Sequence, residues 1–299
     1  MTGAAVFEEI NEVKADFEEI NEVKADMDHI YNQHDPRAYF RELKKLGYTI
    51  PGAAQPIFKK VISHLQRRRS GTVHVLDLGC SYGVNAALLK HDLTMPELYE
   101  HWGQEELADA THQEVVAHDR SFFADLDPDQ NIQVIGLDQA ENAVAFAEET
   151  GLLDEGLAVN LETEELSAPA RDDLAAVDLV MSTGCVGYVT DKSFDRLLPA
   201  INRDAPAWLA NFVPRMFPFD AIEDSLSEQG YVTEKLEGQT FVQRRFASAE
   251  EQEKVLEQLA ELGIDPAGKE AEGHFHAEFY LSRPAREAAE MPIERLRLA

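Results

Sequence analysis

Short apolar runs and longer amphipathic segments alternate along most of this chain. The runs predict strands, and the segments in which apolar residues recur every three or four positions predict helices. The expected strands are Val75–Leu78, Ile132–Leu137, Leu157–Leu161, Val177–Met181, Trp208–Val213 and His274–Leu281, and the expected helices include Asn142–Glu149, Ser193–Ile201, Ala221–Glu228 and Ala249–Leu262. The segment 231–246 predicts further strand pieces of uncertain extent. This alternation predicts an α/β protein whose mostly parallel sheet is covered by helices on both faces.

The N-terminal part of the chain has a different pattern. Residues Phe7 to Asp16 recur identically as Phe17 to Asp26, with apolar positions spaced by three and four, which predicts a helix. Two copies are too few for a repeat protein, so a recent duplication explains them better than a functional array. Prolines then break the pattern into short helices before a further helix that reaches Arg69.

Two of the predicted strands end in residues suited to binding a nucleoside. After Leu78 the chain reads Gly79-Cys80-Ser81-Tyr82-Gly83, where glycines permit a tight turn and close approach of a ligand. The second strand ends in Asp138, whose carboxylate could accept both hydroxyls of a ribose. A dinucleotide-binding motif would need G-x-G-x-x-G and an acid about 20 residues later, and the chain lacks both.

These two segments resemble motifs I and II of the class I S-adenosylmethionine-dependent methyltransferases. The resemblance covers roughly residues 70–284. It implies a Rossmann-like, seven-stranded sheet, mostly parallel with the last strand antiparallel, in a catalytic domain over 70–299. Residues 91–130 are then a helical insertion after the first helix, and residues 1–69 resemble the helical lid of small-molecule methyltransferases. Such N-terminal helices could also form a homodimer contact.

The resemblance also implies S-adenosylmethionine as cofactor and assigns residues to it. The methionine part is expected near Asp77 and the glycine turn, the ribose near Asp138, and the adenine after the third strand. Two positions depart from the family pattern, because Ser81 replaces a glycine and Asn160 stands where an aspartate is more common. The full set expected to bind the cofactor is Asp77, Gly79, Cys80, Ser81, Gly83, Asp138, Gln139, Asn160, Leu161 and Thr183.

Candidates for catalysis and substrate binding are less specific. Tyr188 follows the fourth strand and is the first catalytic candidate, since its hydroxyl could orient an acceptor or act as a weak base; alternatively, its ring could form an aromatic wall. His276 could act as a base near neutral pH or be a packed, hydrogen-bonded residue. Arg215 could clamp a substrate carboxylate, bind the carboxylate of the cofactor or form a structural ion pair. In the lid, Tyr31 and Tyr39 are the substrate-binding candidates, with Tyr48 as a further lid tyrosine.

The composition of the chain indicates its cellular environment and the kinds of partner it can bind. With 299 residues and 44% apolar composition, the chain can bury a large core, and no apolar run approaches the roughly 20 residues of a membrane span. The N-terminus lacks a signal-peptide pattern and Cys80 and Cys185 are the only cysteines, so we expect a cytoplasmic protein with reduced thiols. The net charge of -29 disfavours nucleic acids and anionic membranes. It suits a high-salt cytoplasm or, alternatively, a cationic substrate.

The predicted insertion carries several histidines among acidic residues. His91, His101, His112 and His118 show no compact ligand spacing, so the sequence predicts no metal centre.

Three functions follow from the resemblance. The first is methyl transfer to oxygen, nitrogen or carbon of a small molecule. The second is cyclisation or lysis of the same cofactor with release of methylthioadenosine, and the third is cofactor binding without catalysis. Room beside the methyl group would favour transfer, whereas a closed aromatic cage around the sulfonium would favour cyclisation.

Overall fold

The computed structural model describes residues 28–69, 71–201 and 205–298. The duplicated segment, residues 7–26, lies outside the described residues, and so does most of the region expected to form a dimer contact.

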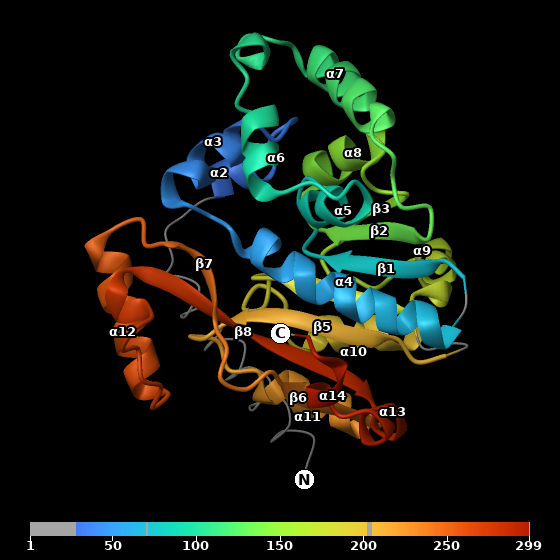
Figure 1. The fold of residues 1–299 in the computed structure, drawn as a ribbon, viewed down its shortest axis with the longest axis vertical. Helices are drawn as coiled ribbons and strands as arrows, with labels where there is room; N and C mark the ends of the chain where they lie inside the picture. The colour runs from blue at the N-terminus through green and yellow to red at the C-terminus, as the bar shows by residue number, and fades with distance from the viewer. Residues whose placement is uncertain (1–27, 70, 202–204, 299) are drawn as a thin grey trace.

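A single twisted sheet forms the centre of the molecule (Figure 1). Its strand order is β3-β2-β1-β4-β5-β8-β6, and β7 pairs with β8 beside this path. The first five strands are parallel, and β8 is antiparallel to β5. The strands are β1 (Val73–Leu78), β2 (Ile132–Asp138), β3 (Glu155–Ala158), β4 (Leu179–Thr183), β5 (Trp208–Pro214), β6 (Tyr231–Lys235), β7 (Phe241–Arg245) and β8 (His274–Pro284).

The expected mostly parallel sheet with an antiparallel last strand is confirmed, but it has eight strands instead of seven. The extra strand arises because 231–246 divides into β6 and β7, which pair with different halves of β8. Strand β8 spans 11 residues and is long enough for both. Its predicted alternation is also confirmed, since Phe275, Ala277, Phe279 and Leu281 are buried.

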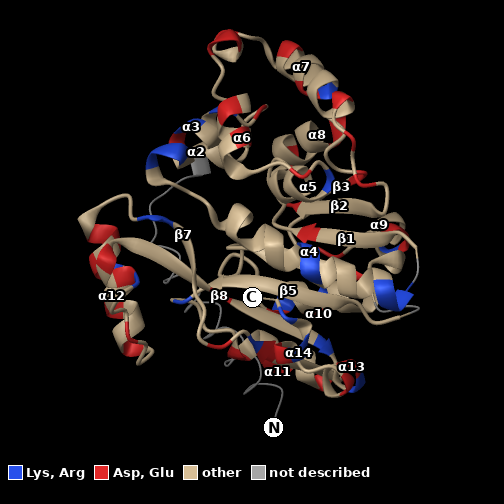
Figure 2. Ribbon diagram, in the orientation of Figure 1, with Lys and Arg blue, Asp and Glu red and all other residues tan. Residues whose placement is uncertain are grey.

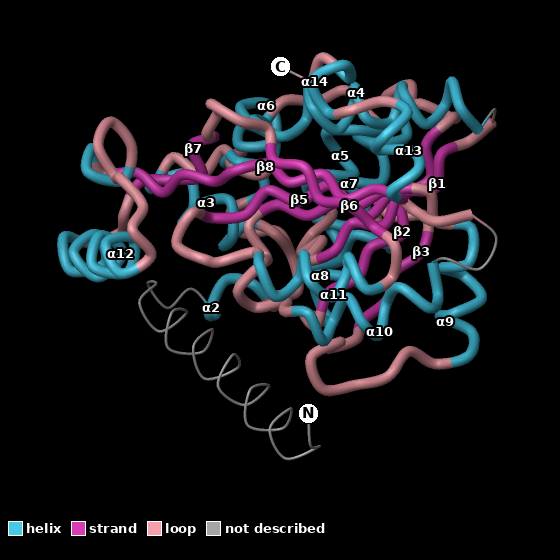
Figure 3. Tube along the Cα trace, turned by 90° about the horizontal axis from the view of Figure 1, so that it is seen from below, coloured by secondary structure: helices cyan, strands magenta, loops and turns pink. Residues whose placement is uncertain are grey.

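Helices cover both faces of the sheet (Figure 3). Helices α4 (Ile50–Arg69), α5 (Val84–Lys90) and α8 (Glu141–Glu149) share one apolar core with the sheet, and α9 (Ala168–Asp173), α10 (Asp191–Ile201), α11 (Asp220–Glu228) and α12 (Ala249–Glu261) share the other. Along β1, Val75 belongs to the first core and Leu76 to the second, because side chains of a strand alternate between faces. Helix α4 therefore packs on the sheet, although it falls in the range predicted as lid.

A helical layer adjoins one end of the sheet (Figure 1). It combines the N-terminal helices α2 (Asp28–Tyr31) and α3 (Arg37–Leu46) with the insertion, which contains α6 (Met95–His101), η1 (Glu105–Leu107) and α7 (His112–Asp125). The ring of Phe40 on α3 lies 4.4 Å from that of Trp102, which follows α6. The predicted helical insertion is thus confirmed, and it packs against the N-terminal helices.

Short helices complete the fold, namely η2 (Leu174–Ala176), η3 (Glu270–Glu272), α13 (Ala285–Glu290) and α14 (Ile293–Leu296). Acidic residues gather on the helices and loops, notably α11 and α12, while the strands are mostly uncharged (Figure 2). Among the described residues, no helix combines the length and apolarity needed to cross a membrane.

Candidate functional site

The carboxyl ends of β1, β2 and β4 meet at one edge, where the glycine turn connects β1 to α5. Gly79, Ser81 and Gly83 have φ values of 75°, 48° and 74°, all in the left-handed region. Of these three residues, Ser81 has a side chain. The left-handed conformation costs about 1–2 kcal/mol for a residue other than glycine. The Asp138 carboxylate offsets part of this cost, because its Oδ2 accepts the backbone N–H of Ser81 at 2.9 Å.

The glycines are needed here for contacts within the protein. A Cβ on Gly79 would lie 2.7 Å from Cβ of Cys185, and one on Gly83 would lie 3.1 Å from Cβ of Ala147. The predicted tight turn is confirmed. The space in front of both glycines is filled by the protein's own side chains, so close approach of a ligand is not what requires glycine at these positions.

Asp77 is a fully buried carboxyl group at the end of β1. Its Oδ1 accepts a hydrogen bond from Nδ2 of Asn85 at 2.9 Å, and the same amide lies 3.2 Å from Oγ1 of Thr183. Its Oδ2 is buried and has no hydrogen-bond partner in the described part of the chain. Burial raises the pKa of Asp77 to about 7, and the Asn85 hydrogen bond opposes the rise. The hydroxyl oxygen of Ser81 is a second buried polar atom without a partner at this edge.

Sequence reasoning missed Asn85 as a member of this group. The signal was its position, since one amide stands in the otherwise apolar stretch Val84–Leu89 and is only 4% exposed. A buried amide in such a helix must find a polar partner, and Asp77 is that partner.

The residues expected at the ribose and adenine lie on neighbouring loops. Asp138 binds Ser81 through Oδ2 and the N–H of Ala140 through Oδ1 at 3.0 Å. A carboxylate offers about four acceptor positions, so two bonds leave capacity for further donors. Asn160 donates from Nδ2 to Oε1 of Gln139 at 3.0 Å, which joins the loops after β3 and β2. Leu161 is buried in the core beneath them.

An aromatic cluster spans from the N-terminal helices to the glycine turn. The Tyr39 ring lies 5.5 Å from that of Tyr31, 6.2 Å from that of Tyr48 and 5.6 Å from that of Tyr82, each in an edge-to-face arrangement. Tyr39 and Tyr48 are buried, whereas Tyr31 is 37% exposed. Burial raises the pKa of Tyr48, and the nearby Tyr31 and the carboxylate of Asp77 raise it further. Of the three tyrosines expected in the lid, Tyr48 thus lies close enough to Asp77 to sense its charge.

Tyr82 connects this cluster to the turn through its hydroxyl group. The hydroxyl accepts the N–H of Gln33 at 2.8 Å and lies 3.0 Å from the carbonyl oxygen of Gln33. Next to it, the N–H of Asn142 at the start of α8 donates to Oδ1 of Asn32 at 2.9 Å. Residues 30–33 are therefore attached to two of the loops that form the edge.

The loop after β4 carries Tyr188 and Cys185. Tyr188 is 52% exposed, and its backbone N–H donates to the carbonyl oxygen of Cys185 at 3.0 Å. The Cys185 thiol donates to the carbonyl of Leu78 at 3.3 Å, and burial raises its pKa to about 12. A thiol with this pKa stays protonated at neutral pH and is a poor nucleophile.

Arg215 follows the end of β5, two strands away from β1, and His276 lies on the neighbouring strand β8. Arg215 is 7% exposed, and its Nη1 lies 2.5 Å from Oε2 of Glu270. This is the structural ion pair that the sequence left open as one of three roles. Nδ1 of His276 lies 3.1 Å from the Thr240 hydroxyl, and burial, followed by the charge of Arg215, lowers the His276 pKa to about 4. His276 is therefore neutral at pH 7, and its pKa is not poised near neutrality as expected.

No protein-family model matches the chain, and no curated protein matches it. Several solved structures do match the chain. The chain is similar to the plantazolicin methyltransferase BpumL in complex with SAH, at 13% identity over 93% of this chain and 99% of that chain, with a TM-score of 0.44. It is also similar to the magnesium protoporphyrin IX methyltransferase ChlM from Synechocystis PCC 6803 with bound SAM, at 14% identity over 78% and 80% of the chains and a TM-score of 0.36. The [4+2]-cyclase SpnF matches at 17% identity over 75% and 80%, with a TM-score of 0.34.

These identities and TM-scores are too low to establish the fold, which is instead defined by the strand arrangement of the chain itself. Five parallel strands in the order 3-2-1-4-5 are followed by an antiparallel strand inserted before the edge strand. By this topology the chain has the fold of the class I S-adenosylmethionine-dependent methyltransferases.

Proposed function

We propose that this protein binds S-adenosylmethionine at the carboxyl edge of β1 and β2 and transfers its methyl group to a small-molecule acceptor. One observation carries the proposal. The buried Oδ2 of Asp77 has no hydrogen-bond partner among the residues that the structure describes, and it lies at the end of the strand that leads into the glycine turn. A buried carboxylate oxygen without a donor costs free energy unless a ligand supplies one, and an ammonium group is the best donor.

The residues of this edge fit the parts of the cofactor. Asp77 accepts from the ammonium group of the methionine part, and the unpartnered Ser81 hydroxyl binds a second polar atom there. Asp138 uses its remaining acceptor capacity for the ribose hydroxyls. The Gln139 and Asn160 pair borders the adenine. When bound, the cofactor supplies a methyl group already activated on a sulfonium centre, so positioning is the main task of the protein.

The aromatic cluster excludes water from the sulfonium. Ring faces attract cations by about 0.5–2 kcal/mol, and Tyr39 and Tyr48 are both buried beside the edge. Tyr188, on the loop after β4, orients the acceptor through its hydroxyl. Arg215 takes no part in this proposal because Glu270 occupies its guanidinium.

Cyclisation of the cofactor is the second candidate function, and one observation favours it. The Tyr39 ring contacts the rings of Tyr31, Tyr48 and Tyr82, and an aromatic cluster of this kind is what the chemistry would use around the sulfonium. In that reaction an amine or carboxylate of the methionine part attacks its own side chain, and methylthioadenosine leaves.

The released nucleoside distinguishes the two functions. The protein is incubated with S-adenosylmethionine alone and then with panels of small amines, phenols and carboxylic acids, and products are separated by chromatography and mass spectrometry. S-adenosylhomocysteine that forms only with an acceptor supports methyl transfer. Methylthioadenosine that forms without an acceptor would contradict methyl transfer and support cyclisation. If the cofactor binds but neither product forms, the protein binds the cofactor without catalysis.

Asp138 provides a direct test of the cofactor site. Asp138→Ala removes charge-assisted hydrogen bonds to the ribose, so we expect binding of S-adenosylmethionine to weaken by about 1.5–3 kcal/mol, which is about 10-fold to 150-fold. Isothermal titration calorimetry measures the change.

A matched control lies at the opposite edge of the same sheet. Oδ2 of Asp178 accepts the backbone N–H of His74 at 3.0 Å, so Asp178→Ala also removes a carboxylate that holds backbone. This variant is expected to lose stability but to keep its affinity. Equal losses in the two variants, or unchanged affinity in Asp138→Ala, would contradict the proposed site.

A further inference from the structure

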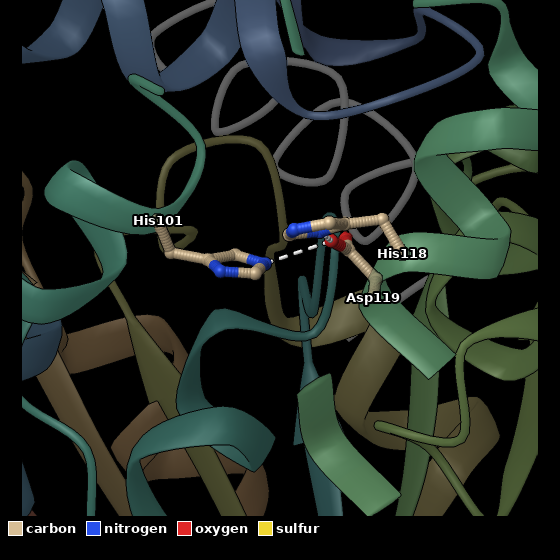
Figure 4. A group of neighbouring side chains, drawn as sticks. All are labelled: His101, His118 and Asp119. Atoms are coloured by element: carbon tan, nitrogen blue, oxygen red, sulfur yellow. Dashed lines mark hydrogen bonds and ion pairs between the residues drawn. The ribbon is translucent and has the colours of Figure 1, made fainter. Parts of the chain in front are cut away.

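Three potential metal ligands that are separated in sequence converge inside the insertion (Figure 4). His101 is the last residue of α6, and His118 and Asp119 are neighbours on α7. Each offers one ligand atom, and these three atoms lie within 4.8 Å of one another. Nε2 of His101 lies 2.7 Å from Oδ1 of Asp119, and Nδ1 of His118 lies 3.3 Å from the same oxygen.

The group is buried on one side and accessible on the other. Asp119 is 0% exposed and His101 is 3% exposed, whereas 38% of the His118 side chain is exposed. Within the described residues, the ion-pair partners of Asp119 are these two histidines. Nδ1 of His101 is buried without a hydrogen-bond partner. Among the described residues no lysine or arginine pairs with Asp119, and a bound metal ion would supply the positive charge that a buried carboxylate favours.

We propose that His101, His118 and Asp119 bind a divalent transition-metal ion of the Zn²⁺ class. Two imidazoles and one carboxylate are typical ligands of Zn²⁺, and they suit Mg²⁺ and Ca²⁺ poorly, since those ions prefer oxygen ligands alone. Three protein ligands leave a fourth position for water, on the exposed side of His118.

The surroundings of the ligands support such a site. The indole N–H of Trp102 donates to Oδ2 of Asp119 at 2.7 Å, which orients the carboxylate so that Oδ1 faces both histidines. Outer hydrogen bonds of this kind typically accompany metal ligands. The Phe122 ring stacks on His101 at 4.0 Å and limits access of water.

Metal binding requires a particular tautomer of each imidazole. In the metal-free protein the ring N–H groups of His101 and His118 can both point at Asp119. When a metal binds, His101 carries its proton on Nδ1 and His118 carries its proton on Nε2, so each lone pair faces the ion. The ion then joins α6 to α7 next to Trp102, which packs on Phe40 of the N-terminal helices. The site would thus stabilise the helical layer.

The test uses the full-length protein after treatment with a chelator and dialysis. Zn²⁺ is titrated by calorimetry, and Co²⁺ is titrated as a spectroscopic probe, because its visible absorption reports the coordination geometry. We expect one strong equivalent of metal, tetrahedral Co²⁺ bands and a melting temperature that rises with Zn²⁺.

Three single-residue variants distinguish Zn²⁺ binding at this site from general Zn²⁺ binding to the acidic surface. His118→Ala removes a partly exposed ligand and is expected to weaken Zn²⁺ binding at least about 100-fold, while Trp102→Phe weakens it about 10–100-fold. His112→Ala is the matched control, since it removes a histidine of the same helix that is absent from the group and should leave binding unchanged. Circular dichroism checks that each variant is folded.

The proposal fails if the wild-type protein binds no stoichiometric Zn²⁺ at millimolar concentration. It also fails if His118→Ala binds as tightly as the wild type, or if His112→Ala loses as much as His118→Ala. None of these outcomes depends on methyltransferase activity.

Discussion

Asp77 links the stability of the fold to the proposed function. Because the pKa of Asp77 is about 7 in the folded protein, above its ordinary value of 3.8, the folded state holds a proton that the unfolded chain has already lost. Its contribution to the free energy of unfolding is therefore favourable below pH 4 and falls as the pH rises to about 7. The protein keeps this unfavourable carboxyl group at the end of β1, as is common where a ligand completes the interactions of a buried site.

The pH dependence of cofactor affinity tests this interpretation. An ammonium group binds the ionised form of Asp77, so affinity for S-adenosylmethionine should increase about tenfold per pH unit from pH 5.5 to 7 and level off above pH 7. Calorimetric titrations at several pH values measure it.

Asp77→Asn serves as the control, because it keeps a carbonyl oxygen for Asn85 but cannot ionise. Its affinity should be lower and nearly independent of pH over this range. A wild-type profile that is flat, or a variant profile with the same slope as the wild type, would remove Asp77 from contact with the cofactor.

Among the elements, the connection between the N-terminal helices and the glycine turn matters most for the site. Tyr82 is 0% exposed and lies within the turn, and its hydroxyl holds the backbone of Gln33. The turn and residues 30–33 therefore form one hydrogen-bonded unit, and we expect order in this N-terminal segment to depend on a residue of the turn.

Tyr82→Phe should loosen the lid and leave the core intact. The ring keeps its packing while the hydroxyl is lost, so we expect the free energy of unfolding to fall by about 1–2 kcal/mol. Hydrogen exchange should become faster over residues 30–33 and stay unchanged in β1 and β2. Unchanged exchange at Gln33 would show that the hydroxyl does not hold the segment.

Element boundaries were predicted best where the pattern was local. Strand β5 and helices α10 and α11 lie within two residues of their predicted bounds, because apolar periodicity and turn residues mark their ends. The third strand was expected over 157–161 but forms over Glu155–Ala158. It pairs with β2 alone, at the edge of the sheet, so strand pairing sets its register more than its own side chains do.

The chain as a whole is strongly acidic, with a net charge of -29. Like charges spread over the helices repel one another in the folded state, and salt screens this repulsion as the screening length falls from about 10 Å at 0.1 M to about 3 Å at 1 M. The folded protein should therefore gain stability with ionic strength.

We expect the melting temperature to rise steadily from 0.1 to 1 M NaCl, by about 2 °C for each kcal/mol gained. Differential scanning calorimetry measures the rise, and sorbitol at equal osmolality controls for solvent effects that do not depend on charge. An equal rise in sorbitol, or no rise in salt, would show that charge repulsion does not limit the stability of this fold.

The candidate site was predictable in outline and not in detail. Asp77 and Asp138 could be placed from strand ends followed by glycine or a turn, because parallel strands deliver such ends to one edge. The pairing of Arg215 with Glu270 could not, since 55 residues separate them and the packing of η3 against β8 and α12 brings Glu270 to Arg215. The convergence of His101 and His118 has the same origin, because it depends on how α6 and α7 pack.

The resemblance to the class I methyltransferases implied the antiparallel last strand. The sequence alone determined the α/β alternation, the parallel core strands and the tight turn after β1. Those features follow from periodicity and backbone conformation, which act over a few residues. Tertiary structure decided the eighth strand, the unpartnered oxygen of Asp77, the neutral state of His276 and the grouping of His101, His118 and Asp119. These depend on desolvation and on contacts between distant segments, which no local pattern encodes.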